Sequence, residues 1–441
     1  MKKIVFISLI AYLTTLAATQ TVYGRGFMNL RWVSLVILLV AGSLYWIALR
    51  SRGRSSISLD KSAGLLLAYL LMTFVTVISA ENPLFSGFRW ASHTVMLITF
   101  VIFIRQNMTS NHTQIILWAL KFLVAGLLFL SLLKPAPRTI FDDLPVFRGA
   151  MSNGNTMGQI AAMNVLLWFH GFLVERKNWA RYAAVGFACV GVVTLWWTGS
   201  RSAMIMLIAG FFLITYFYRR EMKRKVILCI VLISLSAFIS PELPRKAINF
   251  ITKSQDASTV TSKQITKTRA RVWLSAWEGF QDRPIFGWGF GADSGMGKNW
   301  SVSLTALGTV ERDAVNDFLF MLEGCGVIGF AAYFLLIYIA FLQVPTRIGM
   351  LSLKNGNSYI PLYNMHAIFF TLSISMLMLV QFDNTALSAG NFISVVLWLS
   401  VSAAGTLRRE AKASEMAMRN YITAESIRTA GNTFASSSPS R

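Results

Sequence analysis

The sequence predicts an all-α integral membrane protein with about 12 transmembrane helices. Three observations lead to this class. Apolar residues make up 55% of the 441 residues and charged residues only 14%, and the mean hydropathy is +0.55. The apolar residues form long runs with short charged bridges between them, and basic residues concentrate in alternate bridges. A soluble domain rarely combines these properties, so we expect lipid to surround most of the chain.

Each predicted span is an apolar run close to the length of a helical bilayer crossing, roughly 17 to 25 residues. The first and fourth runs are the shortest. The first, after Lys2 and Lys3, also has features of a signal peptide, but residues 19–23 make a poor cleavage site. The twelve runs lie near Ile4–Ala18, Trp32–Leu49, Ala63–Ala80, Trp90–Ile104, Gln114–Leu133, Met157–Val174, Tyr182–Thr198, Ala203–Tyr218, Val226–Ser240, Asn316–Val344, Leu362–Val380 and Asn391–Leu407.

The distribution of basic residues predicts that both termini are cytoplasmic. Cytoplasmic connections of membrane proteins are enriched in Lys and Arg. With the N-terminus inside, the outer short connections are poorer in base and hold Glu81, Asp142, Asp143 and Asp383. The inner connections and the tail hold Arg50, Arg52, Arg54, Lys61, Arg105, Arg176, Lys177, Arg181, Arg219, Arg220, Lys223, Arg224, Lys225, Arg347, Lys354, Arg408, Arg409 and Lys412.

The net charge of +22 does not indicate nucleic-acid binding, because the basic residues lie beside apolar runs. There they act as topology signals and as contacts for anionic lipid. The three cysteines, Cys189, Cys229 and Cys325, lie in or beside apolar runs without paired spacing. The sequence therefore predicts neither disulfides nor a zinc site.

The span pattern divides the chain into four parts. Residues 1–240 hold the first nine transmembrane helices, 241–315 form a large loop on the periplasmic side, 316–407 hold helices 10–12, and 408–441 form a cytoplasmic tail that begins helical and ends in a flexible polar segment. The loop is too long for a simple connector. It carries ten bases against seven acids. Long loops escape the positive-inside rule; alternatively, these bases face an anionic substrate such as a phosphate ester.

Within the loop, residues 269–281 read as an amphipathic helix. Trp273, Trp277 and Phe280 recur at helical spacing and form an aromatic stripe. Such a stripe suits a helix in the lipid headgroup layer, where Arg269 on the same face would reach phosphate height; packing against the bundle is the alternative. Residues 282–284 end the helix, and the glycines at 287, 289 and 291 predict a tight turn with close backbone approach.

Two further polar segments face the same side of the membrane. The break at residues 198–202 places Arg201 at the outer membrane boundary, where an arginine is costly unless it is paired or functional. Snorkelling to lipid phosphate is the alternative. Residues 152–156 precede the sixth span, and either Asn155 or Thr156 can cap its first turn.

At these segments the sequence resembles the O-antigen ligase and polymerase superfamily, whose motifs occur here in family order. Each motif is weak alone, but the ordered set, over roughly residues 145–330, is fairly specific. The matching pieces are Asn155-x-x-Gly158, Gly199-Ser-Arg201-Ser-Ala203, Arg269-x-x-x-Trp273, Arg283-Pro-Ile-Phe-Gly287-Trp-Gly289-Phe-Gly291, and Ala314-Val-Asn316-Asp-Phe-Leu319 with Gly326-Val-Ile-Gly329.

The resemblance implies a multi-span glycosyltransferase of GT-C-like architecture in the bacterial inner membrane. Such enzymes transfer glycans from a polyprenyl (undecaprenyl) diphosphate carrier on the periplasmic face. The chain departs from the family at Val315, which occupies the position of the usual histidine and cannot accept a proton. Asp313 or Glu311 could replace that base; His93, near the outer face, is a weaker candidate that we expect to be packed.

The chemistry of such a transfer favours arginine. Breaking the bond between a sugar and a lipid diphosphate requires stabilisation of the negative charge on the leaving group, and guanidinium groups match phosphate oxygens. We expect catalytic roles for Arg201, Arg269, Arg271 and Asp313, with substrate binding by Asn155, Trp273, Arg283 and Asn316.

The expected activity is polymerisation of lipid-linked repeat units into exopolysaccharide or O-antigen. Ligation of glycan to lipid A core is the alternative within the family, and a polysaccharide or lipid transporter or flippase is the alternative of another class. The expected partners are the lipid-linked donor, a sugar acceptor, membrane lipids and other polysaccharide export proteins. No cofactor, metal or nucleic acid is required.

Overall fold

The structure is a computed structural model of the chain. It describes residues 2–27, 29–51, 60–133, 139–141, 144–151, 153–175, 177–218, 273–292, 294, 316–345, 360–381 and 391–436. The predicted ninth span and most of the predicted periplasmic loop, with Arg269, Arg271, Asp313 and Val315, lie outside these residues.

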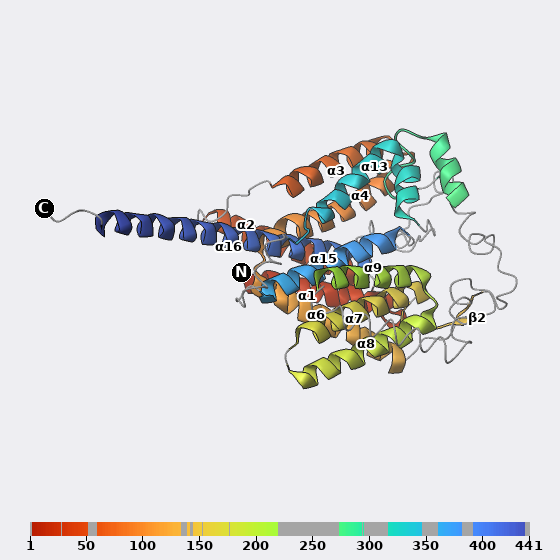
Figure 1. The fold of residues 1–441 in the computed structure, drawn as a ribbon. Helices are drawn as coiled ribbons and strands as arrows, with labels where there is room; N and C mark the ends of the chain where they lie inside the picture. The colour runs from red at the N-terminus through yellow and green to blue at the C-terminus, as the bar shows by residue number, and fades with distance from the viewer. Residues whose placement is uncertain are drawn as a thin grey trace.

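The described chain is almost entirely helical (Figure 1). In addition to the labelled elements given next, a helix covers residues 273–282. The elements are α1 (Lys2–Thr19), η1 (Val22–Phe27), α2 (Leu30–Arg50), α3 (Lys61–Ile78), α4 (Pro83–Leu97), η2 (Ile98–Ile104, a π-helix), α5 (Arg105–Asn107), α6 (Ser110–Leu133), β1 (Thr139–Phe141), β2 (Leu144–Val146), α7 (Gly154–Val174), α8 (Asn178–Thr198), α9 (Arg201–Phe217), α13 (Asp317–Phe341), α15 (Ile360–Val380) and α16 (Phe392–Ser436).

The long apolar helices confirm the predicted class, an α-helical multi-pass membrane protein. Seven described helices are long and apolar enough to cross a membrane, and three shorter apolar helices accompany them. The centre of the bundle is formed by α7 and α15, which have 78% and 83% of their spans buried, whereas α8 has only 22% buried. Because the exposed side chains of α8 are mostly apolar, this helix suits a position against lipid.

One end of the bundle, called the inner end here, gathers residues that the sequence places in the cytoplasm. Asp60, just before α3, forms an ion pair of 2.5 Å with Arg105, which is largely buried. The carbonyl oxygen of Arg105 accepts hydrogen bonds from Thr406 and Arg409 of α16. Burial lowers the pKa of the Arg105 guanidinium, and the Asp60 carboxylate opposes that shift. From this end, α16 continues past the bundle as a single helix to Ser436 (Figure 1).

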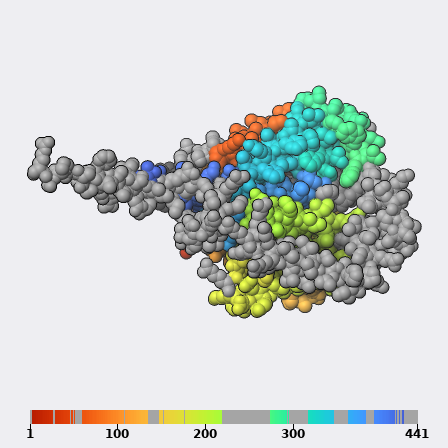
Figure 2. All heavy atoms as spheres, in the orientation of Figure 1, coloured from red at the N-terminus to blue at the C-terminus, as the bar shows by residue number. Residues whose placement is uncertain are grey.

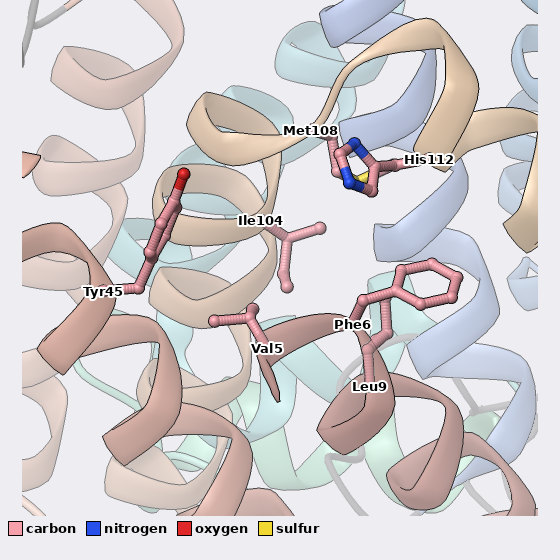
Figure 3. Close-up of a pocket in the computed structure, with 7 residues that line it drawn as sticks. All are labelled: Val5, Phe6, Leu9, Tyr45, Ile104, Met108 and His112. Carbon is pink, nitrogen blue, oxygen red and sulfur yellow. The ribbon is translucent and has the colours of Figure 1, made fainter. Parts of the chain in front are cut away.

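The inner end also contains a small apolar pocket between α1, α2 and α6. Figure 3 shows the side chains that line it, among them Tyr45, Ile104 and His112. The pocket is partly open to the surroundings and leaves room for only about 30 Å³ of water-sized contents. The lining holds no acidic or permanently cationic side chain, so this pocket does not provide a binding surface for a diphosphate.

At the opposite end, called the outer end, hydrogen bonds join the connections α1–α2, α6–α7 and α8–α9. Val22 donates a backbone hydrogen bond of 2.8 Å to Ala150, so the connection after α1 is attached to the segment before α7. The Ala150 amide in turn donates to Ser131 at the end of α6. Phe147 of the same segment donates to the Trp197 carbonyl near the end of α8. The strands β1 and β2 form an antiparallel pair at this end (Figure 1).

The tenth predicted span is not a single rod, which corrects the expectation for residues Asn316–Val344. The backbone of α13 leaves helical geometry at Gly326, where φ is 62° and ψ is −161°. The Phe318 ring lies 5.8 Å from each of the Phe330 and Phe334 rings. In a straight helix, residues 16 apart would be separated by about 24 Å. The part of α13 before Gly326 therefore folds back beside the part after it.

Candidate functional site

Two of the sequence motifs meet at the outer ends of α7, α8 and α9. Gly158, in the second turn of α7, has so little space that a β-carbon there would overlap the Cβ of Ser200 and lie 2.9 Å from Thr198 Oγ1. The Asn-x-x-Gly element and the Gly-Ser-Arg-Ser element, about 40 residues apart in sequence, are thus in direct contact.

The same contact fixes the position of Arg201. Gly199 ends α8 with φ at 62°, a left-handed conformation that favours glycine. The Ser200 side chain then caps α9 by accepting a hydrogen bond from Ala203 N. Arg201 is the first residue of α9 and is half-buried. Its side chain therefore starts at a helix N-terminus, the end of a helix that attracts anions.

Asn155 lies near this corner, but it does not cap α7 as the sequence suggested. Asn153 is the cap residue, and its side chain accepts a hydrogen bond of 2.8 Å from the Asn155 amide. Both asparagines and Thr156 were compatible with a cap by residue type, and only the backbone geometry distinguishes them. Asn155 and Thr156 lie in the first turn of α7 and are half-buried.

The other two motifs interlock around the break in α13. The carbonyls before the break, of Glu323 and Gly324, accept hydrogen bonds from Trp288 N and Gly289 N. After the break, Val327 N donates to the Pro284 carbonyl at 2.9 Å. A helix interruption leaves backbone groups without partners, which is costly in a membrane. The glycine-rich segment, residues 284–291, supplies those partners.

Glycine is required in this segment because the backbones approach so closely. Gly287, Gly289 and Gly291 have positive φ values of 66°, 115° and 76°, as expected for a tight turn. A β-carbon at Gly287 would overlap the Gly324 backbone, and one at Gly289 would overlap Ser86 and Ala80 at the α3–α4 connection. The segment is therefore wedged between α13 and the outer ends of α3 and α4 (Figure 2, green and cyan against orange).

The helix of residues 273–282 lies against this wedge. The Trp288 indole N–H donates to the Gly279 carbonyl at 2.8 Å, and a β-carbon at Gly279 would lie 2.6 Å from Glu323 Oε1. Trp273, its first described residue, is half-buried, whereas Trp277 is 45% exposed and packs on Phe280. Within the aromatic stripe, Trp273 is therefore partly packed against the protein, whereas Trp277 lies on the exposed face of the helix.

Arg283 lies at the end of that helix and is held on two sides. Its guanidinium is 4.2 Å from the centre of the Trp288 ring and 3.7 Å from the Glu81 carboxylate. Both charged side chains are about one third exposed. Arg283 is thus fixed at the outer end, with part of its charge balanced by Glu81.

Asn316 begins α13, and its side chain has a structural task. Its carbonyl oxygen accepts hydrogen bonds from Phe318 N at 2.8 Å and Leu319 N at 3.3 Å. This is an N-cap. Only the side-chain NH₂ group of Asn316 is left for substrate contact, so it can donate a hydrogen bond but its oxygen is already used.

Comparison with protein families gives one match, over residues 185–334, to the family described as O-antigen ligase. This part of the chain is similar to the O-antigen ligases. It covers roughly a third of the 441 residues and confirms the resemblance drawn from the motifs. No curated protein matches the chain significantly. The family consists of ligase enzymes of the glycosyltransferase type, and it implies lipid-linked oligosaccharide substrates and contact with membrane lipids.

The matched region contains Arg201, Arg283 and the whole glycine-rich segment, and residues outside the match also contribute to the site. Gly158 of α7 touches Ser200, and the α3–α4 connection touches the glycine-rich segment. The two motif pairs are joined through α15, which packs against both α9 and α13 (Figure 1). The structure thus places Arg201 with Asn155, and Arg283 with Trp273 and Asn316, at the same end of the bundle.

Two arginines of the outer end were missed in the sequence. Arg89 of α4 lies against Gly291 and over the Phe85 ring. Arg31 at the start of α2 lies over the Trp32 ring, and Trp32 contacts Phe88. A signal was present, because each arginine immediately precedes a tryptophan at the start of an apolar run. Both arginines lie at the outer end, where the positive-inside rule predicts few basic residues.

Proposed function

We propose that the chain polymerises polyprenyl-diphosphate-linked oligosaccharide repeat units at the periplasmic face of a bacterial inner membrane. The observation that carries this proposal is the position of Arg201. It begins α9 at the outer end, beside the Gly158–Ser200 contact and inside the region that matches the O-antigen ligase family. We assign catalytic roles to Arg269, Arg271 and Asp313 as well; these three residues lie outside the described part of the chain.

The reaction places a clear demand on these side chains. As the bond between the anomeric carbon and the diphosphate oxygen breaks, negative charge grows on the departing diphosphate. A guanidinium keeps its charge at any relevant pH and matches two phosphate oxygens at once. At the N-terminus of α9 the helix dipole adds to the attraction. Asn155, Trp273, Arg283 and Asn316 would bind the sugar and phosphate groups.

Within the family, polymerisation is favoured over ligation to lipid A core by two features of the sequence. Val315 occupies the position of the usual histidine, and the Phe-Gly-Trp-Gly-Phe-Gly block at residues 286–291 is more typical of exopolysaccharide polymerases. Ligation remains the alternative, and the two activities leave different products.

One observation favours a transporter as the second candidate. Transporters commonly bind their substrates where helices are interrupted, and α13 is interrupted at Gly326. The glycine-rich segment, however, already satisfies the backbone groups at this break. The described residues show no matching interruption in another long helix, as paired repeats would require. We therefore place the transporter second.

Replacing Arg201 by Lys and by Ala in the native host tests the proposal. Surface polysaccharide is separated on a gel, lipid-linked sugars are extracted, and the variant protein is quantified in membranes. Arg201→Ala should abolish long chains, and Arg201→Lys should restore little, because an ammonium does not form the paired contacts of a guanidinium. Arg181→Ala is the matched control, since Arg181 lies near the start of α8 at the inner end, over the Phe172 ring.

The products distinguish the activities. A polymerase defect leaves single repeat units on the lipid carrier, a ligase defect leaves long polymer on the carrier, and a flippase defect leaves repeat units that are accessible only from the cytoplasm. Normal surface polysaccharide with well-expressed Arg201→Ala would overturn the proposal.

A further inference from the structure

The fold of α13 creates a buried polar cluster below the glycine-rich segment. Asp317, the first residue of α13, is completely buried. Its carboxylate accepts a hydrogen bond of 3.3 Å from the Tyr333 hydroxyl, two turns beyond the break at Gly326. Gln381, at the outer end of α15, donates to the same hydroxyl at 3.4 Å. The fold-back of α13 thus brings together polar groups that a straight helix would keep apart.

Two more helices add polar groups to this cluster. Tyr69 of α3 is completely buried, and its hydroxyl interacts electrostatically with the Asp317 carboxylate. The His93 ring of α4 lies 6.0 Å from the Tyr69 ring and 5.5 Å from the Phe290 ring of the glycine-rich segment. Four helices therefore direct polar side chains to one place, directly beneath the segment that carries the family motif.

Several atoms of this cluster have no hydrogen-bond partner among the described residues. They are the Tyr69 hydroxyl, both ring nitrogens of His93 and the side-chain oxygen of Gln381. A buried polar atom without a partner costs roughly 1–3 kcal/mol, and folded proteins rarely leave such atoms unsatisfied. Tyr69 and His93 are each at least 99% buried. So many unsatisfied groups in one place indicate a site that receives a polar ligand or transfers protons.

We infer that this cluster receives the proton of the acceptor sugar hydroxyl, with Asp317 as the proton acceptor. The inference rests on the proposed function, which needs a group to take that proton because Val315 stands where the family has histidine. Asp317 lies two residues from Val315. The Asn316 cap directs the N-terminus of α13 towards the cluster, and this end of a helix favours a carboxylate in its charged form.

The step balances without any further reactant. The acceptor hydroxyl oxygen forms a bond to the anomeric carbon, and the bond between that carbon and the diphosphate oxygen breaks. The electron pair of the broken bond leaves with the diphosphate, whose charge the arginines stabilise. The hydroxyl proton passes to the Asp317 carboxylate, either directly or through the Tyr333 hydroxyl, which donates to that carboxylate and can accept a proton in turn. It then returns to water as the product departs.

The experiment uses membranes of the native host with their endogenous lipid-linked repeat units, and it measures the rate of chain elongation between pH 5 and pH 8. Asp317→Asn keeps the shape of the side chain. It should lower the rate by about 10²–10⁴-fold, the usual contribution of a positioned base, and should remove whatever part of the pH dependence comes from protonation of this carboxylate. Asp317→Glu should restore part of both. The titratable groups that interact with Asp317 are Tyr69 and Tyr333, and His93 and Cys325 lie behind them, next to Tyr69.

Glu323→Gln is the matched control. Glu323 is also a buried carboxylate in the first part of α13, but it accepts hydrogen bonds from Ser294 N and Oγ at 3.0 and 2.8 Å. Its loss should lower the amount of stable protein and leave the pH profile unchanged. Tyr333→Phe, which keeps the ring, separates packing from proton transfer and should lower the rate less than Asp317→Asn.

The outcomes separate the inference from the proposed function. An Asp317→Asn protein with a wild-type rate and pH profile, beside an inactive Arg201→Ala protein, would overturn the inference and leave the function standing. Full elongation by both variants would overturn the function. An Asp317→Asn protein that loses activity only in proportion to its amount in the membrane would also overturn the inference, because Asp317 would then be structural.

Discussion

Gly158 and Ser200 are in direct contact, with no space between them for a side chain at position 158. This contact lies between the start of α7 and the start of α9, and it connects two motifs that are each unremarkable in sequence. Because Arg201 follows Ser200 directly, the packing of an apolar helix sets the position of a charged group. A perturbation of Gly158 should therefore reach the site without any change to its charges.

Gly158→Ala tests this connection. The added methyl group must displace Ser200, and overpacking of this kind typically costs about 1–3 kcal/mol. We expect a lower melting temperature of the detergent-solubilised protein and shorter surface polysaccharide. Gly186→Ala on α8 is the control, because a β-carbon at Gly186 meets nothing within 4 Å. Equal effects of the two substitutions would contradict the role of the contact.

The sequence predicted the features that depend on composition and periodicity. Eleven of the twelve predicted spans fall on described residues and are helical, because an apolar run in lipid must satisfy its backbone internally. The close approach at Gly287, Gly289 and Gly291 was also predicted, since glycine at alternate positions of a short segment suits a backbone that residues with a β-carbon rarely adopt.

Other features depend on three-dimensional contacts that no local pattern encodes. The break at Gly326 occurs in an apolar stretch that reads as one span, and it exists because residues 284–291 supply hydrogen bonds to it. Nothing in the local sequence around Asp317 or Arg89 indicates the groups that surround them in the bundle. Their surroundings come from helices up to about 250 residues apart in sequence, so only the assembled bundle reveals them.

Replacing Gly326 should damage the fold more than replacing an ordinary helical glycine. Its backbone conformation is accessible almost only to glycine, and a β-carbon there would overlap the Ile285 carbonyl. We expect Gly326→Ala to lower the yield of folded protein sharply, as seen by size-exclusion chromatography. Gly64→Ala on α3, where a β-carbon has free space, should behave like the wild type; a normal yield for Gly326→Ala would show that the break is not required.

Substitutions in the Arg283–Glu81 pair distinguish a role of Arg283 in substrate binding from a role in stability. Partly exposed ion pairs contribute little, typically below about 1 kcal/mol, so Glu81→Gln should leave both stability and polysaccharide nearly unchanged. Arg283→Ala should shorten the polysaccharide, because it removes a charge that we assign to substrate binding. If both variants behave alike, Arg283 serves only to pair with Glu81.

The Arg105–Asp60 pair at the inner end should matter for stability and not for the length of the polysaccharide. Arg105 is largely buried whereas Asp60 is 35% exposed, so removing the Asp60 charge leaves a buried guanidinium poorly paired and should cost part of the about 3–5 kcal/mol typical of a fully buried pair. Asp60→Asn should therefore lower the melting temperature strongly. The protein that remains folded should still make polysaccharide of normal length, since this pair lies at the end of the bundle opposite Arg201. A selective loss of long chains in folded Asp60→Asn protein would place chemistry at the inner end.

The orientation of the bundle is the expectation on which the mechanism depends most. In a background with Cys189 and Cys229 replaced by Ser, single cysteines at Glu81, Lys263 and Lys412 report the sides of the membrane; Cys325 is buried and can stay. A maleimide that cannot cross the inner membrane should label positions 81 and 263 in cells with a permeabilised outer membrane. Position 412, on the exposed helix beyond the inner end, should react only after lysis. Labelling of 412 but not of 81 or 263 in unlysed cells would place Arg201 in the cytoplasm, where it could not meet a carrier diphosphate that presents its glycan to the periplasm.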